Sequence, residues 1–200
     1  MRILAIETAT EACSVALFED GQLIGARHEV LGRGHAERLV PMIAELPGKG
    51  RADVIRVSLG PGSFTGVRIG LATARALAIA WQAAVVGYPT LALVAAQAGR
   101  AATVCMNGGH GEFFVQHFDT DGLAEGEVTS LPPAEAARSA RHRVIAGNRA
   151  AALAELLDGD REILDILPDA REVLRLDPAH LTSALSPIYG RGPDAKLPGT

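Results

Sequence analysis

The sequence predicts an α/β protein in which one order of strands and helices occurs twice. Residues 1–30 contain three strand-like segments joined by short turns, and helical and strand-like segments then alternate as far as residue 98. After residue 100 a pair of strand-like segments followed by the same turn chemistry starts again. This repetition favours a duplication, although two short hairpins can also match by chance.

The first three segments are predicted to form a meander of strands. Residues 2–7 are a short apolar run, and residues 13–19 place apolar side chains on one face at the two-residue period of a strand. The dipeptide Asp20-Gly21 tolerates the positive φ of a tight hairpin turn, and residues 22–30 supply the third strand.

Helices and strands then alternate up to residue 98. Helices are predicted where apolar residues recur every three or four positions, and strands where short apolar runs lie between breakers. In chain order we expect a helix at 34–46, a strand at 54–59, a helix at 65–81, a strand at 85–86 and a helix at 90–98. The first half therefore follows the order βββαβαβα.

The second half repeats the beginning of this order and then becomes short. Asp121-Gly122 repeats the turn chemistry of Asp20-Gly21. The expected elements are strands at 103–107, 112–118, 143–146 and 162–165 and helices at 133–139 and 150–157. We predict one domain at residues 1–99 and a smaller one at residues 100–200 that ends in an extended tail.

Composition and charge exclude several classes of function. Hydrophobic residues make up 48% of the 200 residues and charged residues 21%, which is typical of a folded domain. A net charge of −4 disfavours independent binding of nucleic acid, because that affinity comes from cationic side chains. The apolar runs are shorter than the roughly 18 residues that a membrane span needs, and the N-terminus has no signal-peptide layout. We therefore expect a cytoplasmic protein without membrane association.

Neither the cysteines nor the histidines have the spacing of a metal site. Cys13 and Cys105 lie in separate strand-like runs without a CxxC motif, and we expect them to be buried small hydrophobic residues. The six histidines lack HxxH, HxxxH and HExxH spacing. We expect no bound metal and no disulfide.

The turn at residues 7–12 is a candidate for phosphate chemistry. In phosphotransferases of the actin and sugar-kinase type, this turn carries an acid that orients a metal-bound water, then a glycine and a hydroxyl residue beside the nucleotide phosphates. Here the acid is Glu7, but Ala9 stands at the glycine position and Asn107 stands where the second half would place another acid. A methyl group blocks close approach of the backbone to a phosphate. A polar hairpin turn with a capping threonine is the alternative.

The glycine-rich segment at residues 60–70, GPGSFTGVRIG, directly precedes the long predicted helix. Unpaired amides and the positive end of the helix dipole suit an anion there, with Thr8, Gly62, Ser63 and Thr65 as candidate contacts. The segment lacks the Gly-Lys-Ser/Thr ending of a P-loop. Under the structural alternative, Ser63 caps the helix and the glycines allow a sharp turn. As a nucleophile, Ser63 or Thr65 would need a base that the sequence does not place.

The helix at residues 65–81 carries a ridge of small side chains, because Gly66, Gly70, Ala74 and Ala78 recur every four residues. A second backbone can approach such a ridge closely. The second backbone could belong either to the protein's own sheet or to a helix of a partner. Arg68 and Arg75 lie seven residues apart and share another face of the helix.

Several of these motifs together resemble the TsaB (YeaZ) family. They are ILAIETAT at residues 3–10, GPGSFTGVRIG at residues 60–70 and PIYGR at residues 187–191. Members of this family are the dimerisation subunit of the bacterial complex that makes N6-threonylcarbamoyladenosine in tRNA. The resemblance spans the chain and implies an actin-like (ASKHA) fold of two ribonuclease-H-like halves, the second reduced. Members usually have Asp where this chain has Glu7, and an acid where it has Asn107.

The resemblance implies a scaffold without catalytic residues or a cofactor of its own. Its implied partners are a TsaD-type transferase, a TsaE-type ATPase in the assembled complex and tRNA through that complex, with a homodimer when the chain is alone. The first two helices would form the interface. The contact residues expected there are His35, Arg38, Leu39, Met42, Phe64, Arg68, Gly70, Leu71, Ala74 and Arg75.

Two other classes of function stay open at this point. The first is an enzyme of actin-like fold, either an ATP-dependent phosphotransferase or a glycoprotease-like hydrolase. Ala9 and Asn107 argue against the phosphotransferase, and the missing pair of nucleophile and base argues against the hydrolase. The second class is a free-standing regulatory dimer that binds other proteins.

Overall fold

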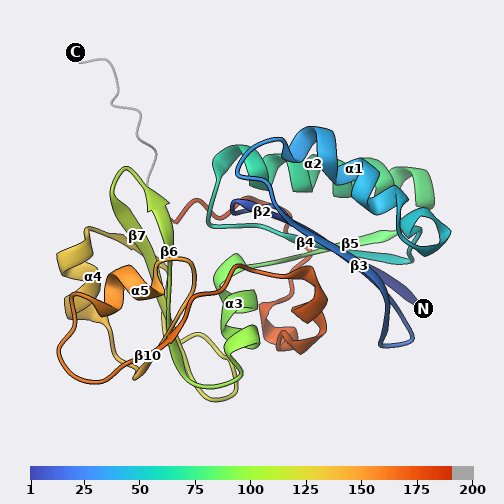
Figure 1. Cartoon of the computed structure of the whole chain (residues 1–200). Coiled ribbons are helices and arrows are strands. Elements are labelled where there is room, and N and C mark those ends of the chain that lie inside the picture. Colours follow the sequence, from blue (N-terminus) through green and yellow to red (C-terminus); the bar gives the residue numbers. More distant parts are fainter. Residues whose placement is uncertain (191–200) are drawn as a thin grey trace, which may run out of the picture.

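The structure, a computed structural model, describes residues 1–190 and contains two five-stranded sheets with helices against them (Figure 1). The first sheet is formed by β1 (Arg2–Glu7), β2 (Ala12–Glu19), β3 (Gln22–Val30), β4 (Val54–Ser58) and β5 (Ala84–Tyr88). The second is formed by β6 (Ala102–Gly109), β7 (Glu112–Phe118), β8 (Thr129–Leu131), β9 (Val144–Ala146) and β10 (Glu162–Leu164).

The helices between these strands differ in length between the two halves. The α-helices are α1 (His35–Ala44), α2 (Phe64–Trp81), α3 (Thr90–Ala98), α4 (Pro133–Ser139) and α5 (Ala150–Ala154). The 3₁₀ segments are η1 (Pro47–Gly50), η2 (Ala170–Arg175) and η3 (Pro178–His180). In the first half α1 and α2 have 10 and 18 residues, whereas their counterparts α4 and α5 have 7 and 5.

Both sheets have the same topology. The order is β3-β2-β1-β4-β5 in the first sheet, and the second, taken from its β8 edge, runs β8-β7-β6-β9-β10. In each, the first strand is central, the second and third join it antiparallel on one side, and the fourth and fifth join it parallel on the other. The predicted α/β, actin-like fold of two ribonuclease-H-like halves with a reduced second half is therefore confirmed.

Two predicted helices end early and one strand was not predicted. The helix expected at 34–46 ends at Ala44, because the ring of Pro47 and its missing N–H interrupt a regular helix. The helix expected at 150–157 ends at Ala154. Strand β8 has three residues, too few for an alternation that the sequence alone could reveal.

The two sheets share a core that is built around α3. Most residues of α3 are buried, and they pack together with side chains from both sheets, such as Phe18 of β2 and Phe114 of β7. Figure 1 shows α1 and α2 on the opposite face of the first sheet, and a second core lies between these helices and the sheet. Because α3 is apolar on all sides, it fits only between two packed layers.

The chain returns to the first sheet at its C-terminal end. Segment η2 packs on β1, β2 and β3, and the Oγ of Ser14 donates to Asp169 Oδ1 at 3.3 Å just before η2. Residues 182–190 then run along the edge strand β5, where Thr182 and Gly87 exchange backbone hydrogen bonds of 2.7 and 3.0 Å. The predicted boundary at residue 100 separates the two sheets, but this final segment belongs structurally to the first half. Of the tail expected from residue 187 on, positions beyond 190 lie outside the described residues.

Both cysteines are free and buried, as the sequence predicted, and burial raises the pKa of each thiol to about 12.

Between residues 1 and 190 no helix is long and apolar enough to cross a membrane.

Candidate functional site

A cleft of about 740 Å³ lies between the two halves. Its walls come from loops of both halves and from the ends of β6, α1 and α2, so residues far apart in the sequence meet there. The lining residues are 9–11, 32–37, 61–66, Ile69, 106–110 and Asn148. This volume lies within the range of small-molecule sites in proteins.

Glycines allow the loop before α2 to lie directly on the turn after β1. A side chain on Gly62 would collide with the carbonyl oxygen of Ala9, and one on Gly66 would collide with that of Thr8. The amide of Ser63 donates to Ala9 O at 2.7 Å, and the Oγ of Ser63 accepts from Gly66 N at 3.2 Å, which caps α2. The structural interpretation of this motif therefore explains its glycines and its serine.

The four predicted anion contacts separate into two groups. Gly62, Ser63 and Thr65 line the cleft, and the first turns of both α1 and α2 face it with the positive ends of their dipoles. Thr8 does not line the cleft. Its side chain is buried, and its hydroxyl donates to Gly66 O at 2.8 Å beneath the loop.

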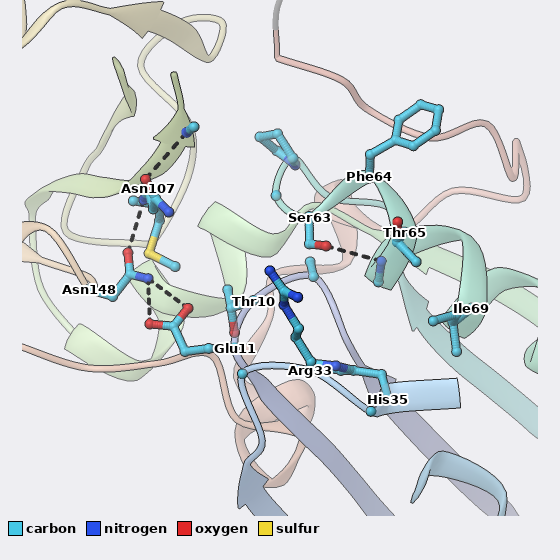
Figure 2. Close-up of a pocket in the computed structure, with 18 of the residues that line it drawn as sticks. Thr10, Glu11, Arg33, His35, Ser63, Phe64, Thr65, Ile69, Asn107 and Asn148 are labelled. Carbon is cyan, nitrogen blue, oxygen red and sulfur yellow. Dashed lines mark hydrogen bonds between the residues drawn. The ribbon is translucent and has the colours of Figure 1, made fainter. Parts of the chain in front are cut away.

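Arg33 extends into the middle of the cleft, toward Thr10 and Ser63 (Figure 2). Within residues 1–190 its guanidinium has no ion-pair partner. Arg33 and the two helix N-termini place positive charge on this wall of the cleft, and Glu37 in the first turn of α1 lines it as well.

A chain of hydrogen bonds joins the two halves at the opposite wall. The side-chain amide of Asn148 donates to both carboxylate oxygens of Glu11 at 3.0 Å, and its oxygen accepts from the Asn107 amide at 3.0 Å (Figure 2). Asn107 uses its own side chain to accept from Gly109 N at 3.3 Å. The end of β6 therefore carries an amide network where a phosphotransferase would place a second acid.

Glu7 does not face the cleft. Its side chain is fully buried, its Oε1 accepts from the Ala9 amide at 2.7 Å, and its Oε2 has no hydrogen-bond partner among the described residues. Burial raises the pKa of this carboxyl to about 7, although hydrogen bonds from its neighbours partly offset the effect. The acid of the phosphotransferase-like turn is thus part of the core and cannot orient a ligand in the cleft.

Six of the ten predicted interface residues are buried. The ridge of small residues on α2 faces the protein's own sheet, where a side chain on Gly70 would collide with Thr8 Oγ1. Five of the predicted partner contacts are buried in the core of their own chain: Leu39, Met42, Gly70, Leu71 and Ala74. His35 is buried as well, with Nε2 3.2 Å from Ala12 O.

The other four predicted contacts are accessible. Arg38 pairs with Glu29 and Glu45 of its own chain. Phe64, Arg68 and Arg75 lie on the exposed side of α2.

The exposed sides of α1 and α2 carry small and apolar residues that were not singled out from the sequence. They are Ala36, Val40 and Ala44 on α1, and Ala72, Ala76 and Ile79 on α2. The two helices are in contact, so these residues form one surface, which we call the outer helix face. Val40 is 53% exposed and Ile79 is 83% exposed. Their spacing of three or four residues, outside the buried stripe, is the signal that could have identified them.

Comparisons with known proteins agree with this fold. A sequence model of the family described as TsaD, tRNA N6-adenosine threonylcarbamoyltransferase, matches residues 23–158. The chain is 45% identical over 105 residues to the tRNA threonylcarbamoyladenosine biosynthesis protein TsaB of Escherichia coli, a match that covers 50% of the chain and 45% of that relative. It is 30% identical over 146 residues to a tRNA N6-adenosine threonylcarbamoyltransferase of Anaeromyxobacter, covering 58% of the chain and 44% of that relative. In these matches the chain spans about half the length of the curated relatives.

Among solved structures, YeaZ from Pseudomonas aeruginosa superimposes with a TM-score of 0.79 at 28% identity, over 94% of this chain and 99% of that one. The ethanolamine utilization protein EutJ from Carboxydothermus hydrogenoformans shares the fold alone, with a TM-score of 0.51 at 9% identity over 88% and 89% of the two chains. The chain therefore belongs to the family that the TsaD model describes and, within it, to the TsaB/YeaZ family.

Proposed function

We propose that the protein is an accessory subunit that binds a TsaD-type transferase and supports the formation of N6-threonylcarbamoyladenosine in tRNA. The names of its relatives connect it to this pathway. The observation that carries the proposal is the outer helix face. It is an apolar surface on the two longest helices of the first half that no described part of the chain covers.

The outer helix face has the properties of an interface core. Val40 and Ile79 are exposed by more than half, and the alanines around them let a second surface approach closely. The small-residue ridge of α2 packs against the protein's own sheet, so the exposed sides of α1 and α2 are left for the partner. With Phe64, Arg68 and Arg75, this side also supplies aromatic and arginine residues of the kind that dominate binding energies.

The cleft supports an accessory role for this chain. Glu7 is buried away from it, and the corresponding end of β6 carries an amide network in place of an acid. Neither Glu7 nor position 107 therefore presents an acid to the cleft for phosphoryl transfer. We infer that catalysis takes place in the transferase, and that a TsaE-type ATPase joins the same assembly.

The net charge of −4 supports tRNA contact through the transferase rather than through this chain. We further infer that the complex is cytoplasmic, and that the outer helix face pairs two copies of this chain when the partner is absent.

Substitution of Ile79 tests this proposal, because Ile79 is the more exposed of the two large apolar residues on the outer helix face. Ile79→Asp should weaken binding of a TsaD-type subunit, measured by calorimetry, about a hundredfold, since an unpaired charge would be buried in an apolar contact. The matched control is Ile163→Asp on β10, where Ile163 is 46% exposed, and it should bind like the wild type.

The same proteins should differ in a reconstituted reaction with the transferase, a TsaE-type ATPase, threonylcarbamoyl-adenylate and tRNA. Wild type and Ile163→Asp should support modification, and Ile79→Asp should not. Equal modification with and without this chain would refute the accessory role, and unchanged binding of Ile79→Asp would refute the assigned surface.

A further inference from the structure

The C-terminal segment at residues 182–190, which we call the strap, borders α2 on the side away from α1. Helix α1 packs over β2, α2 packs over β4, and the strap joins the β5 edge of the same sheet. In Figure 1 the strap is the red segment between the 3₁₀ helices and the grey trace. The surface of α2 therefore has α1 on one flank and the strap on the other.

The strap is anchored along its length. Thr182 exchanges two backbone hydrogen bonds with Gly87, and the Ile188 amide donates to Leu59 O at 2.8 Å. Leu185 and Ile188 pack against the core beneath α1 and α2. Displacing the strap would break these hydrogen bonds and expose both side chains, so the strap is a fixed part of the first half rather than a loose cover.

The strap also holds the three accessible side chains of α2 that the sequence singled out. Arg75 Nη2 donates to Leu185 O at 2.8 Å, and Arg68 Nη2 donates to Tyr189 Oη at 3.3 Å. The guanidinium of Arg68 lies 3.6 Å from the centroid of the Phe64 ring, and the centroid of the Tyr189 ring lies 5.6 Å from that of Phe64.

This stack stays open to solvent on its outer side. Phe64 is 54% exposed and Tyr189 is 46% exposed, although the neighbouring strap residues are partly buried. Exposing two aromatic rings to water is unfavourable. Because the strap already limits the rotamers of these side chains, a protein partner that buried them would lose little side-chain entropy on binding.

We propose that the strap is part of the surface that binds the TsaD-type subunit, with Tyr189 as a direct contact and with Phe64, Arg68 and Arg75 held in position by the strap. This inference rests on the proposed function. The stack is continuous with the outer helix face, because Phe64 and Arg68 lie on the same exposed side of α2 as Ala72 and Ala76. The strap therefore extends the docking surface across the N-terminal end of α2.

Substitutions at Tyr189 test the proposal through the affinity for the TsaD-type subunit, measured by calorimetry. Tyr189→Ala should weaken binding about tenfold, because it removes one ring of the stack and releases Phe64 and Arg68. Tyr189→Phe keeps the ring and loses only one exposed hydrogen bond, so its affinity should stay within about twofold of wild type. Ile163→Ala is the matched control, since Ile163 is also 46% exposed but lies on β10. Circular dichroism and thermal unfolding check that each variant is folded.

Hydrogen exchange of the strap gives a second readout. The amides of Thr182 and Ile188 should exchange more slowly in the complex than in the free chain. Unchanged or tighter binding by Tyr189→Ala, or faster exchange of these amides in the complex, would overturn the proposal, because the strap would then be irrelevant or displaced. If the wild-type chain itself fails to bind the transferase, the proposed function fails, which is a distinct result.

Discussion

Replacing Glu7 by Gln should remove a pH dependence from the stability of the protein. Glu7 is fully buried, and its Oε2 has no hydrogen-bond partner among residues 1–190. Burial raises its pKa from the ordinary value of 4.5 to about 7 in the folded state. Gln has almost the same shape, can still accept from the Ala9 amide, and carries no charge at any pH.

Whether stability rises or falls with pH depends on which state, folded or unfolded, holds the proton more tightly. Below pH 4.5 the carboxyl is protonated in both states, so the wild type has its full stability. As the pH rises from about 4.5 to about 7, the unfolded chain releases this proton while the folded chain keeps it, and the free energy of unfolding falls. Above about pH 7 both states are ionised and the loss is complete. The folded-state pKa of about 7 lies about 2.5 above the ordinary value of 4.5, and at about 1.36 kcal/mol for each step of one in pKa this difference corresponds to about 3 kcal/mol.

Urea unfolding of wild type and Glu7→Gln at several values between pH 4 and pH 8 measures this quantity. The difference in unfolding free energy should change by about 3 kcal/mol across this range in favour of the Gln variant, because all other titrating groups cancel in the comparison. Glu37→Gln, at an exposed position on α1, controls for the loss of one negative charge. A difference between wild type and Glu7→Gln that stays constant with pH would refute the reasoning.

Two further substitutions test the core and the contact between the halves. Gly70→Leu should lower the unfolding free energy by more than about 2 kcal/mol, because the new side chain would collide with Thr8 beneath α2. The control, Ala72→Leu on the exposed side of α2, should unfold like the wild type. Equal stability of the two variants would contradict the assigned packing. Asn148→Asp should lower the unfolding free energy at pH 7 by about 1 kcal/mol more than Asn148→Ala does, because it places a second carboxylate against Glu11. The same urea titration measures both losses, and equal losses would contradict the close approach of residue 148 to the Glu11 carboxylate.

Much of the fold could be predicted from local patterns. The bounds of β3, α3, β7 and α4 agree with the segments expected from the sequence, because period, turn residues and breakers all lie within a few positions of each element. The repeated strand order was suggested by its hairpins. Strand β8 could not be predicted, because a three-residue edge strand owes its pairing to β7 rather than to a pattern of its own.

The candidate site was less predictable, since it depends on what each face of a helix meets. Leu39 and Val40 are neighbours in the sequence, yet one is fully buried and the other is 53% exposed. The ridge on α2 was correctly recognised as a place where a backbone can approach, but the sequence left open whether that backbone was the protein's own. In the structure it is the turn after β1, which closes on Gly66 and Gly70.

By itself, the sequence determined the class of fold, the order of its elements and the family, because these follow from residue patterns along short stretches of chain. Only the tertiary structure decided that Glu7 lies in the core, that the outer side of α1 and α2 is free, and that the strap meets Phe64 and Arg68. The physical reason is that burial and contact between residues more than a hundred positions apart depend on how the sheets, helices and C-terminal segment pack. No local pattern records that packing.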